Sequence, residues 1–449
     1  MSHNRLHLYE RDDNVKDTAR LRRRILGGEA TVAVIGQGYV GLSLACAAAE
    51  CGFRVTGIDV NETRVADLAA GTLSVPGVNE ELFRAGVAGG RVQFTTETDA
   101  LATSDVILIC VPTPLRDEIP DLSFVERAAR EVSRHLSPGR LVVLESTTYP
   151  GTTEDLVRPI LEESGLVAGH DFLLAYSPER IDPGNGEFDL RNTPKIVGGL
   201  TPEATGIASL FYDQIVDKVQ PVSSARTAEL AKLLENTFRH VNIALVNEMA
   251  ILCHEMGIDV WEVIEATATK PFGFMPFYPG PGVGGHCIPL DPTYLSWQVR
   301  RDAGRQFRIL EQAQDINTQM PSYVVARIGD ALNEVHKSVK GACILVLGVA
   351  YKPDVGDVRE SPSMKVIAQL HRRGAEVCFH DPYVPEVTLD GGLLPRTELT
   401  QRVVATADCV VLLTPHHAYD LDWLAEHAQL IFDARNAFGP DRRSNVVPL

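Results

Sequence analysis

The sequence lacks any apolar run long enough to cross a membrane, since no stretch approaches the roughly 18 uninterrupted apolar residues that a spanning helix needs. Basic residues are also in deficit: 42 Lys and Arg stand against 59 Asp and Glu over 449 residues, a formal charge of −17. This acidity argues against a nucleic-acid or membrane-surface partner, so any phosphate site must be local. Residues 1–29 lack the apolar core of a secretory signal, and we expect them to form an arm or a short amphipathic helix.

Cysteine pairs of the CxxC type are absent as well. Most of the eight cysteines lie within apolar runs such as ILIC and ACILVL, where cysteine behaves as a small hydrophobic residue. This usage is typical of a reduced cytoplasm, so we expect a cytoplasmic protein with neither disulfides nor a metal site. Cys287 differs from the others because it lies in a polar, glycine-rich segment.

Two regions alternate short apolar strands with helical patterns, which predicts parallel sheets covered by helices on both faces. The expected strands begin near residues 31, 54, 105 and 140 in the first region and 342, 376, 409 and 430 in the second. Between the regions, residues 226–256 contain no Gly or Pro and carry apolar side chains at helical spacing. The pattern predicts an α/β protein with two Rossmann-like, doubly wound parallel-sheet domains joined by a long central helix.

Domain boundaries follow from the same pattern. We predict an N-terminal arm over 1–29, a first α/β domain over 30–222, a central helical region over 223–328 and a second α/β domain over 329–449. The apolar run of 226–256 exceeds what one small flanking domain would cover. We therefore expect a homodimer, or a larger homo-oligomer, built on this helix.

A GxGxxG pattern follows the first apolar strand directly and opens a helix, which is the context in which this pattern binds a dinucleotide. The glycines permit a tight turn and a close approach to a pyrophosphate, which the helix N-terminus attracts. The next strand ends at Asp59, whose carboxylate is placed to accept hydrogen bonds from a ribose diol and would repel a 2′-phosphate. We therefore expect NAD rather than NADP, bound by Asp59 and by the loop residues Gly36, Gln37, Gly38, Tyr39, Val40 and Gly41.

Residues 277–291 form a glycine-rich segment whose backbone can wrap closely around a ligand. Cys287 in this segment is a candidate nucleophile, since His286 and Asp291 could tune its thiolate. Taken alone, the segment fits a structural thiol about equally well. Metal ligation by His286 and Cys287 is less favoured, because no further ligands stand at metal spacing.

Two further patterns carry candidate catalytic groups. Lys232 and Asn236 are four residues apart on the predicted helix and therefore project from one face. Among its apolar neighbours Lys232 could stabilise an oxyanion, and the alternative is a solvated lysine on the outer face of the helix. Glu179, within YSPER, is likewise either a general base or an ordinary turn carboxylate.

With these residues assembled, the chain resembles the UDP-glucose/GDP-mannose dehydrogenase family, the NAD-dependent nucleotide-sugar 6-dehydrogenases, from about residue 31 to residue 436. The ordered motifs are GQGYVGL at 36, VPTP at 111, ESTTYPGTTE at 145, SPERIDPGN at 177, ELAKLLENTFR at 229, PGPGVGGHCIPLDP at 279, GVAYKPDVGDVRESPS at 348 and DAR at 433. Hydroxyacid or 6-phosphogluconate-type dehydrogenases would share the N-terminal fold but need no cysteine. A silent nucleotide sensor would not need to retain the candidate catalytic residues.

The resemblance implies a four-electron oxidation of a sugar C6 alcohol to a carboxylate, with two NAD used in succession. Cys287 would capture the intermediate aldehyde as a thiohemiacetal, and water would hydrolyse the thioester that follows. Lys232 and Asn236 would stabilise the developing negative charge. Asp291, aided by Thr147, would position the water or accept its proton.

The resemblance also implies binding residues. Arg64 would join the cofactor site, Thr113 and Ser146 would line its nicotinamide side, and Arg359 would contribute from the second α/β domain. That domain carries GVAYKPD in place of GxGxxG, so we expect it to bind the nucleotide diphosphate of a UDP-sugar instead of a second NAD. Glu179 would act in acid/base chemistry and touch the substrate. The implied substrate contacts are Glu179, Lys232, Asn236, Tyr278, Gly282, Gly284, Gly285, Tyr351, Lys352 and Arg435.

The segment around Cys287 indicates which sugar the substrate carries. Glucose-oxidising members usually carry Ser before the nucleophile, whereas this chain has His286. KPFGFMPFYPGPGVGGHCIPLDP and SPERIDPGN resemble the UDP-N-acetylhexosamine branch, particularly its N-acetylglucosamine members. We therefore expect UDP-N-acetylglucosamine as substrate, with UDP-glucose or a dTDP-hexose such as dTDP-glucose as the alternative.

Overall fold

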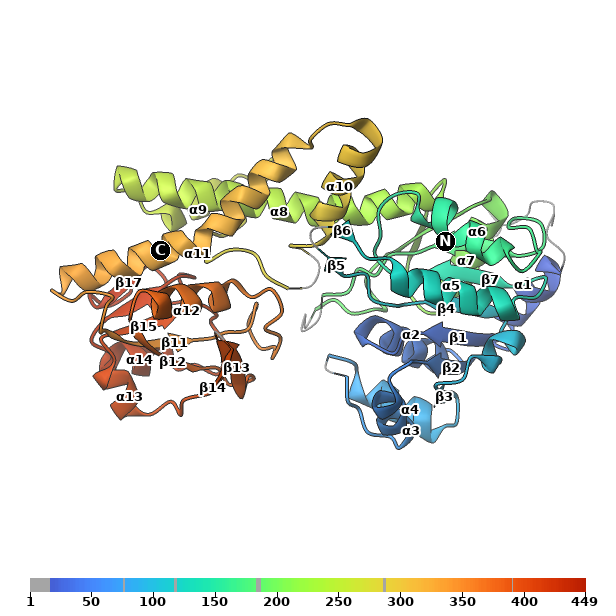
Figure 1. The fold of residues 1–449 in the computed structure, drawn as a ribbon, viewed down its shortest axis with the longest axis horizontal. Coiled ribbons are helices and arrows are strands. Elements are labelled where there is room, and N and C mark those ends of the chain that lie inside the picture. The colour runs from blue at the N-terminus through green and yellow to red at the C-terminus, as the bar shows by residue number, and fades with distance from the viewer. Residues whose placement is uncertain (1–16, 76, 117–118, 183–186, 286–287, 390) are drawn as a thin grey trace. The chain divides into compact units, whose positions relative to one another are not determined.

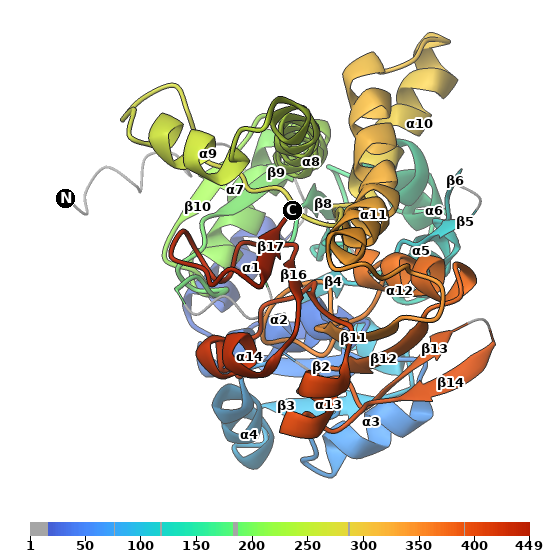
Figure 2. The ribbon, with the colours of Figure 1, turned by 90° about the vertical axis from the view of Figure 1, so that its left-hand side faces the viewer.

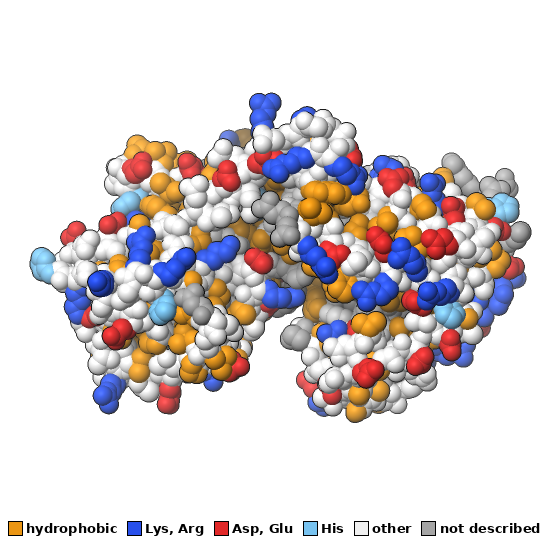
Figure 3. All heavy atoms as spheres, viewed as in Figure 1, with side chains coloured by type: hydrophobic (Ala, Val, Ile, Leu, Met, Phe, Trp, Pro, Cys, Tyr) orange, Lys and Arg blue, Asp and Glu red, His pale blue; other side chains and the backbone are white. Residues whose placement is uncertain are grey.

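The computed structural model describes residues 17–449, apart from 76, 117–118, 183–186, 286–287 and 390 (Figure 1). The chain divides into two compact units, Met1–Leu234 and Glu235–Leu449, and the division falls within a helix. On the face shown in Figure 3, basic side chains are interspersed with acidic and apolar ones. No helix of the described residues combines the length and the apolar character needed to span a bilayer.

The first unit is built on an eight-stranded sheet in the order β10-β9-β8-β7-β4-β1-β2-β3. The strands are β1 (Thr31–Ile35), β2 (Arg54–Ile58), β3 (Val92–Thr95), β4 (Val106–Ile109), β7 (Leu141–Leu144), β8 (Leu173–Tyr176), β9 (Lys195–Gly199) and β10 (Val219–Pro221). From β3 to β8 all neighbours pair in parallel, which is the strand order of a dinucleotide-binding domain. The sheet departs from the predicted parallel pattern at one place, where β9 runs antiparallel to β8.

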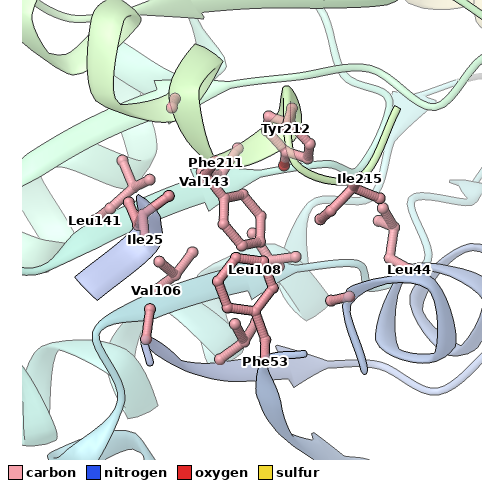
Figure 4. Close-up of a cluster of buried hydrophobic side chains, with 14 of the residues drawn as sticks. Ile25, Leu44, Phe53, Val106, Leu108, Leu141, Val143, Phe211, Tyr212 and Ile215 are labelled. Carbon is pink, nitrogen blue, oxygen red and sulfur yellow. The ribbon is translucent and has the colours of Figure 1, made fainter. Parts of the chain in front are cut away.

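Helices cover both faces of this sheet because successive residues of a buried strand point to opposite sides. Val32 and Val34 of β1 belong to one core and Ala33 to the other. Figure 4 shows the first core, with Phe53 and Phe211 among its labelled side chains. The remaining elements are α2 (Tyr39–Glu50), α3 (Glu62–Ala69), α4 (Glu80–Ala88), η2 (Asp99–Thr103), β5 (Leu115–Arg116), β6 (Ile119–Pro120), α5 (Ser123–His135), η3 (Thr153–Val157), α6 (Arg158–Glu162) and α7 (Pro202–Tyr212).

The N-terminal segment contains the helix α1 (Thr18–Leu26), which contacts α7. Leu21 and Ile25 are buried on one side of α1 within the first core, whereas Arg20 and Arg23 face solvent. This amphipathic helix is therefore packed into the first unit. Residues 1–16 lie outside the described part of the chain.

The long helix expected between the two α/β regions is α8 (Ala225–Met256). It continues without a break for 32 residues, because neither Gly nor Pro interrupts it. Several of its large apolar side chains are half exposed or more, among them Leu234 at 63%, Leu245 at 58% and Met256 at 61%.

The second unit contains a five-stranded sheet in the order β12-β11-β15-β16-β17, with every pair parallel. Its strands are β11 (Cys343–Leu347), β12 (Glu376–His380), β15 (Cys409–Leu412), β16 (Ile431–Asp433) and β17 (Val446–Pro448), with a separate hairpin of β13 (Glu386–Leu389) and β14 (Gly392–Pro395). Its helices are α9 (Val260–Ala268), α10 (Asp291–Ala303), α11 (Arg308–Glu334), α12 (Pro362–Arg372), α13 (Gln401–Thr406) and α14 (Leu421–His427). Figure 2 shows α12 beside α11, and the two helices are in contact. Two Rossmann-like sheets and a long connecting helix confirm the predicted fold class.

Candidate active site

The glycine-rich loop after β1 has the shape that a dinucleotide requires. Gly36 has φ +92°, and a Cβ there would lie 2.4 Å from the Cys110 carbonyl oxygen. A Cβ on Gly41 would lie 1.9 Å from the carbonyl oxygen of Gly36, so both glycines are fixed by packing. A Cβ on Gly38 would meet nothing within 4 Å, and Gly38 caps the N-terminus of α2. The loop therefore leaves open space where a pyrophosphate would approach the helix.

Asp59 lies at the carboxyl end of β2 and ties this loop to the strand. Its carboxylate accepts hydrogen bonds from the backbone N–H of Gln37 at 2.7 Å and of Asn61 at 2.9 Å, and from Arg64 Nη1 at 3.0 Å. A carboxylate offers about four acceptor positions, so these contacts leave capacity for a hydroxyl donor. The Gln37 side chain is fully buried and donates to the Val34 carbonyl, so it fixes the loop and does not face solvent.

Residues that follow β4 and β7 are joined by hydrogen bonds. Thr113 Oγ1 donates to the Thr147 carbonyl at 2.8 Å, and Ser146 Oγ donates to the Val111 carbonyl at 2.7 Å. In this sheet β1 and β4 are neighbours, and the strand order reverses between them: β2 and β3 follow on the side of β1, and β7 and β8 on the side of β4. Ligands of such sheets bind outside the carboxyl ends of these strands. Thr113, Ser146 and Thr147 are thus brought together at the edge where a cofactor is expected.

Two candidate catalytic groups of the first unit, the half-buried Glu179 and the buried Lys232, have unused hydrogen-bonding capacity. Glu179 Oε1 accepts from the backbone N–H groups of Arg180 and Ile181, both at 2.6 Å, while its buried Oε2 has no partner among the described residues. The Lys232 side chain on α8 is only 8% exposed, and no described residue forms an ion pair with it. Buried polar groups are normally paired, so both side chains are available to a bound ligand.

The second unit holds Asn236 and Asp291 in direct contact. Asn236 Nδ2 donates to Asp291 Oδ2, and the two side chains are 5% and 4% exposed. Asp291 is the first residue of α10, where a carboxylate is favoured by the helix N-terminus. Cys287 and His286 lie outside the described residues, so the structure provides no test of the predicted nucleophile.

The loop that precedes Cys287 is anchored by a buried network that the sequence analysis missed. The Gly280 N–H donates to Asn247 Oδ1 at 3.0 Å, and Asn247 Nδ2 donates to Asn317 Oδ1 at 2.9 Å. Asn317 Nδ2 in turn donates to the His240 carbonyl at 3.1 Å. Nothing in the sequence around Asn247 or Asn317 marks this network, because the two residues are 70 positions apart and meet only in the folded chain.

The same loop packs tightly on the second sheet's domain. A Cβ on Gly284 or Gly285 would lie 2.9 Å or 2.8 Å from the Tyr351 side chain, and Gly282 and Gly285 have φ +127° and +89°. A Cβ on Gly280 would lie 2.4 Å from Arg435 Nη1. The predicted substrate residues Gly284, Gly285 and Tyr351 are therefore in contact, while Arg435 meets the same loop at Gly280 and Gly282 lies against Asn317 and Pro362.

Three other predicted residues of the second unit, Lys352, Tyr278 and Arg359, have different surroundings. Lys352 Nζ is 5.8 Å from the centre of the Tyr351 ring. Tyr278 is half exposed and stacks on Trp261, with ring centres 6.1 Å apart. The exposed guanidinium of Arg359 pairs with Asp357, while the Arg359 carbonyl accepts from the Gly285 N–H at 3.2 Å.

Arg435 is a cation whose guanidinium has no salt bridge with any described carboxylate. Its Nε donates to the Leu413 carbonyl at 3.2 Å, and Asp433 accepts from its backbone N–H instead of its side chain. Burial lowers the pKa of Arg435 to about 10. An anionic ligand would relieve the cost of this desolvation.

The second sheet also has an aspartate at the carboxyl end of its second strand, but the hydrogen bonds of this aspartate differ from those of Asp59. Asp381 follows β12 and accepts from the backbone N–H groups of Val349 and Ala350, at 2.8 and 3.1 Å, and from His416 Nε2 at 3.0 Å. Burial alone would raise the pKa of Asp381, but these hydrogen bonds and one from the Tyr383 N–H outweigh it and lower the pKa. Asp381 is 0% exposed and accepts from four donors, so it keeps no capacity for a further donor, in contrast to Asp59.

Three family models match the chain in succession. The NAD binding, central and UDP binding domains of the UDP-glucose/GDP-mannose dehydrogenase family match residues 30–216, 226–319 and 345–440. The chain belongs to this family. It is accordingly an NAD-dependent dehydrogenase, as predicted, and the open space at Gly38 together with Asp59 fits NAD.

Individual relatives are similar to this dehydrogenase over nearly the whole length of the chain. A UDP-N-acetyl-D-mannosamine dehydrogenase from Pyrococcus horikoshii is 36% identical over 412 residues, covering 90% of this chain and 95% of the relative. An NDP-N-acetyl-D-galactosaminuronic acid dehydrogenase from Ralstonia nicotianae is 35% identical, covering 92% and 97%. A solved structure of UDP-D-ManNAc dehydrogenase from Pyrococcus horikoshii matches with TM-score 0.84 at 34% identity, covering 93% and 98%.

Replacing Asp59 with Ala in this dehydrogenase is expected to raise the KM for NAD about tenfold or more, because a hydrogen bond to a charged group contributes roughly 1.5–3 kcal/mol. Discrimination against NADP should fall, since the repelling carboxylate is gone. Glu62→Ala, at an exposed position on the neighbouring α3, is the matched control. Equal turnover of the unmodified enzyme with NADP and NAD would contradict the ribose assignment.

Proposed function

We propose that this dehydrogenase oxidises the C6 alcohol of a UDP-N-acetylhexosamine to the carboxylate in a four-electron reaction. The observation that carries the proposal is the glycine-rich loop, which packs through Gly284 and Gly285 against Tyr351 and through Gly280 against Arg435, both in the domain matched as UDP binding. We assign NAD binding to 30–222, the central helical and loop region to 223–328 and UDP-sugar binding to 329–449.

The reaction that we propose passes through a covalent intermediate on Cys287. The C6 hydroxyl loses a proton and C6 loses a hydride, which gives an aldehyde. The Cys287 thiolate adds to the aldehyde carbon to form a thiohemiacetal, and loss of a second hydride gives a thioester. Water then attacks the carbonyl, the thiolate leaves, and the uronate forms. Bound NAD serves as the hydride acceptor in both oxidations.

The proposed side-chain roles follow from burial and from unused hydrogen-bonding capacity. The buried ammonium of Lys232 and the amide of Asn236 would donate to the oxyanion, which needs donors already oriented toward it. Asp291, which already accepts from Asn236, would take the proton of the attacking water, with Thr147 aiding that water. Glu179 would exchange protons through Oε2, the oxygen that accepts no hydrogen bond from a described residue.

The UDP moiety would be held by the second unit. Arg435, a desolvated guanidinium without a carboxylate partner among the described residues, would bind the diphosphate together with Lys352. The backbone of Gly282, Gly284 and Gly285 and the ring of Tyr351 would line the remainder of the site. Tyr278 would contribute from the start of the loop.

The sugar that the enzyme oxidises can be identified with a panel of nucleotide sugars. The sequence around Cys287 favours N-acetylglucosamine, while the names of close relatives support N-acetylmannosamine. NADH release should be measured with UDP-N-acetylmannosamine, UDP-N-acetylglucosamine, UDP-N-acetylgalactosamine, UDP-glucose and dTDP-glucose. We expect an N-acetylhexosamine to be preferred and two NADH to be released for each sugar consumed. One NADH per sugar would contradict the four-electron reaction, and a preference for glucose would support the alternative substrate.

We also propose that the enzyme forms a homodimer or a larger homo-oligomer through α8. Leu234, Leu245 and Met256 expose apolar area that a second copy would cover. Sedimentation at micromolar concentration is expected to show no monomer, and Leu245→Glu should shift the population toward one. A monomer of the unmodified chain would contradict this assignment. A cytoplasmic location remains our proposal, supported by the seven described cysteines, all of which are free thiols.

A further inference from the structure

A buried charged cluster in the first unit has no role in the reaction as described so far. Lys195 Nζ donates to Glu145 Oε2 at 2.8 Å, and the Tyr212 hydroxyl donates to the other oxygen of Glu145. All three residues are at most 3% exposed, and Figure 4 shows Tyr212, the last residue of α7. Lys195 Nζ also lies 5.0 Å from the centre of the Tyr212 ring.

The cluster joins the two loops that carry proposed active-site residues. Glu145 follows β7 directly and is the residue before Ser146 and Thr147. Lys195 Nζ donates to the Pro178 carbonyl at 3.3 Å, and Pro178 precedes Glu179. One ammonium group therefore holds both the loop after β7 and the loop after β8.

Stability alone does not account for such a cluster. Burying an ion pair costs desolvation free energy, and replacing both partners by apolar residues of similar size is often neutral or stabilising. Burial alone would lower the pKa of Lys195, but the carboxylates of Glu145 and Glu179 outweigh it and raise the pKa. Lys195 is thus charged, and its charge acts on Glu179 as well as on Glu145.

We propose that Lys195 is a positioning residue for the dehydrogenase reaction: held by Glu145, its ammonium fixes the Pro178–Glu179 turn relative to the loop that carries Ser146 and Thr147. This inference rests on the proposed acid/base role of Glu179. The titratable groups that interact electrostatically in this cluster are Lys195 of β9, Tyr212 of α7, Glu145 after β7, Glu179 after β8 and the Cys110 thiol after β4. Removing Lys195 would leave the Pro178 carbonyl without this donor, and the turn that carries Glu179 would lose its link to Glu145.

The test compares two variants with one control. Lys195→Met leaves Glu145 buried without its cation, so it can fail to fold. The double variant Glu145→Gln/Lys195→Met removes both charges and keeps a partner for Tyr212. Lys218→Met changes an exposed lysine of the same unit and should behave as the unmodified enzyme.

We expect the double variant to melt near the temperature of the unmodified enzyme while its kcat falls about tenfold to a hundredfold, the loss that a small displacement of a catalytic group causes. The fall should appear in kcat alone, because the displaced group acts on the reaction and does not bind NAD or the nucleotide. The KM values for NAD and the UDP-sugar should change little.

Two results would overturn the inference. A folded double variant with unchanged kcat would show that the cluster serves the fold alone. A fall in kcat accompanied by a comparable rise in both KM values would show a general distortion of the unit and would remove the positioning role. Both results leave the proposed function intact if the unmodified enzyme releases two NADH per UDP-sugar, so the two failures are distinguishable.

Discussion

Cys287→Ala is expected to abolish steady-state formation of the uronate, because the variant has no thiolate to capture the aldehyde. Cys287→Ser should still permit both hydride losses, but it replaces a good acyl leaving group with a poor one. The Ser variant should therefore give a burst of NADH and then stall with the acyl group attached as an ester. Mass spectrometry of this variant after reaction should show the protein heavier by the acyl group of the nucleotide sugar.

The control for this experiment is Cys51→Ser, which alters a half-buried thiol in the first unit. Burial is the main cause that raises the pKa of Cys51, so its thiol is a poor nucleophile and the variant should keep full turnover. Full turnover to the uronate by Cys287→Ala would refute covalent catalysis. The cysteine would then be structural, and the enzyme would activate its aldehyde in another way.

The second large effect is expected for Lys232. Met has a similar length and helix propensity, so Lys232→Met should leave α8 intact while removing the ammonium. We expect kcat to fall about 10²- to 10³-fold, as when one oriented oxyanion donor is deleted. The affinity for NAD should not change. The measurement is steady-state kcat together with NAD binding by fluorescence.

A matched control is Lys365→Met, which removes an exposed lysine from helix α12. It should leave kcat within a factor of about two, because surface substitutions usually have small effects. If Lys232→Met kept kcat, Lys232 would be a packing residue whose stem fills the core.

The features that the sequence predicted well are those encoded in short stretches. The strand, glycine loop and helix from Thr31 to Glu50 show their periodicity within 20 residues, and Asp59 is recognised from its place at the end of the next strand. The uninterrupted helical pattern of α8 is equally local. In each case the side-chain spacing and the backbone preference favour the same structure.

The features that the sequence did not predict depend on residues far apart in the chain. Lys195 and Glu145 are separated by 50 positions, and Asn247 and Asn317 by 70. Nothing local marks either pair, because a buried Lys or Asn has the same sequence signature whether or not it finds a partner. Helix α11 also escaped prediction, since Pro321 lies inside it and proline normally ends a helical pattern.

The pair Asp59 and Asp381 has a consequence for inhibitor design. Both carboxylates end the second strand of a parallel sheet and bind the backbone of the preceding loop, but His416 and three N–H groups saturate Asp381. We therefore expect a compound that mimics the adenosine ribose of NAD to bind at Asp59 and not at Asp381. Its binding stoichiometry should be one per subunit, whereas a compound aimed at the second sheet would use the guanidinium of Arg435, which forms no salt bridge with a described carboxylate.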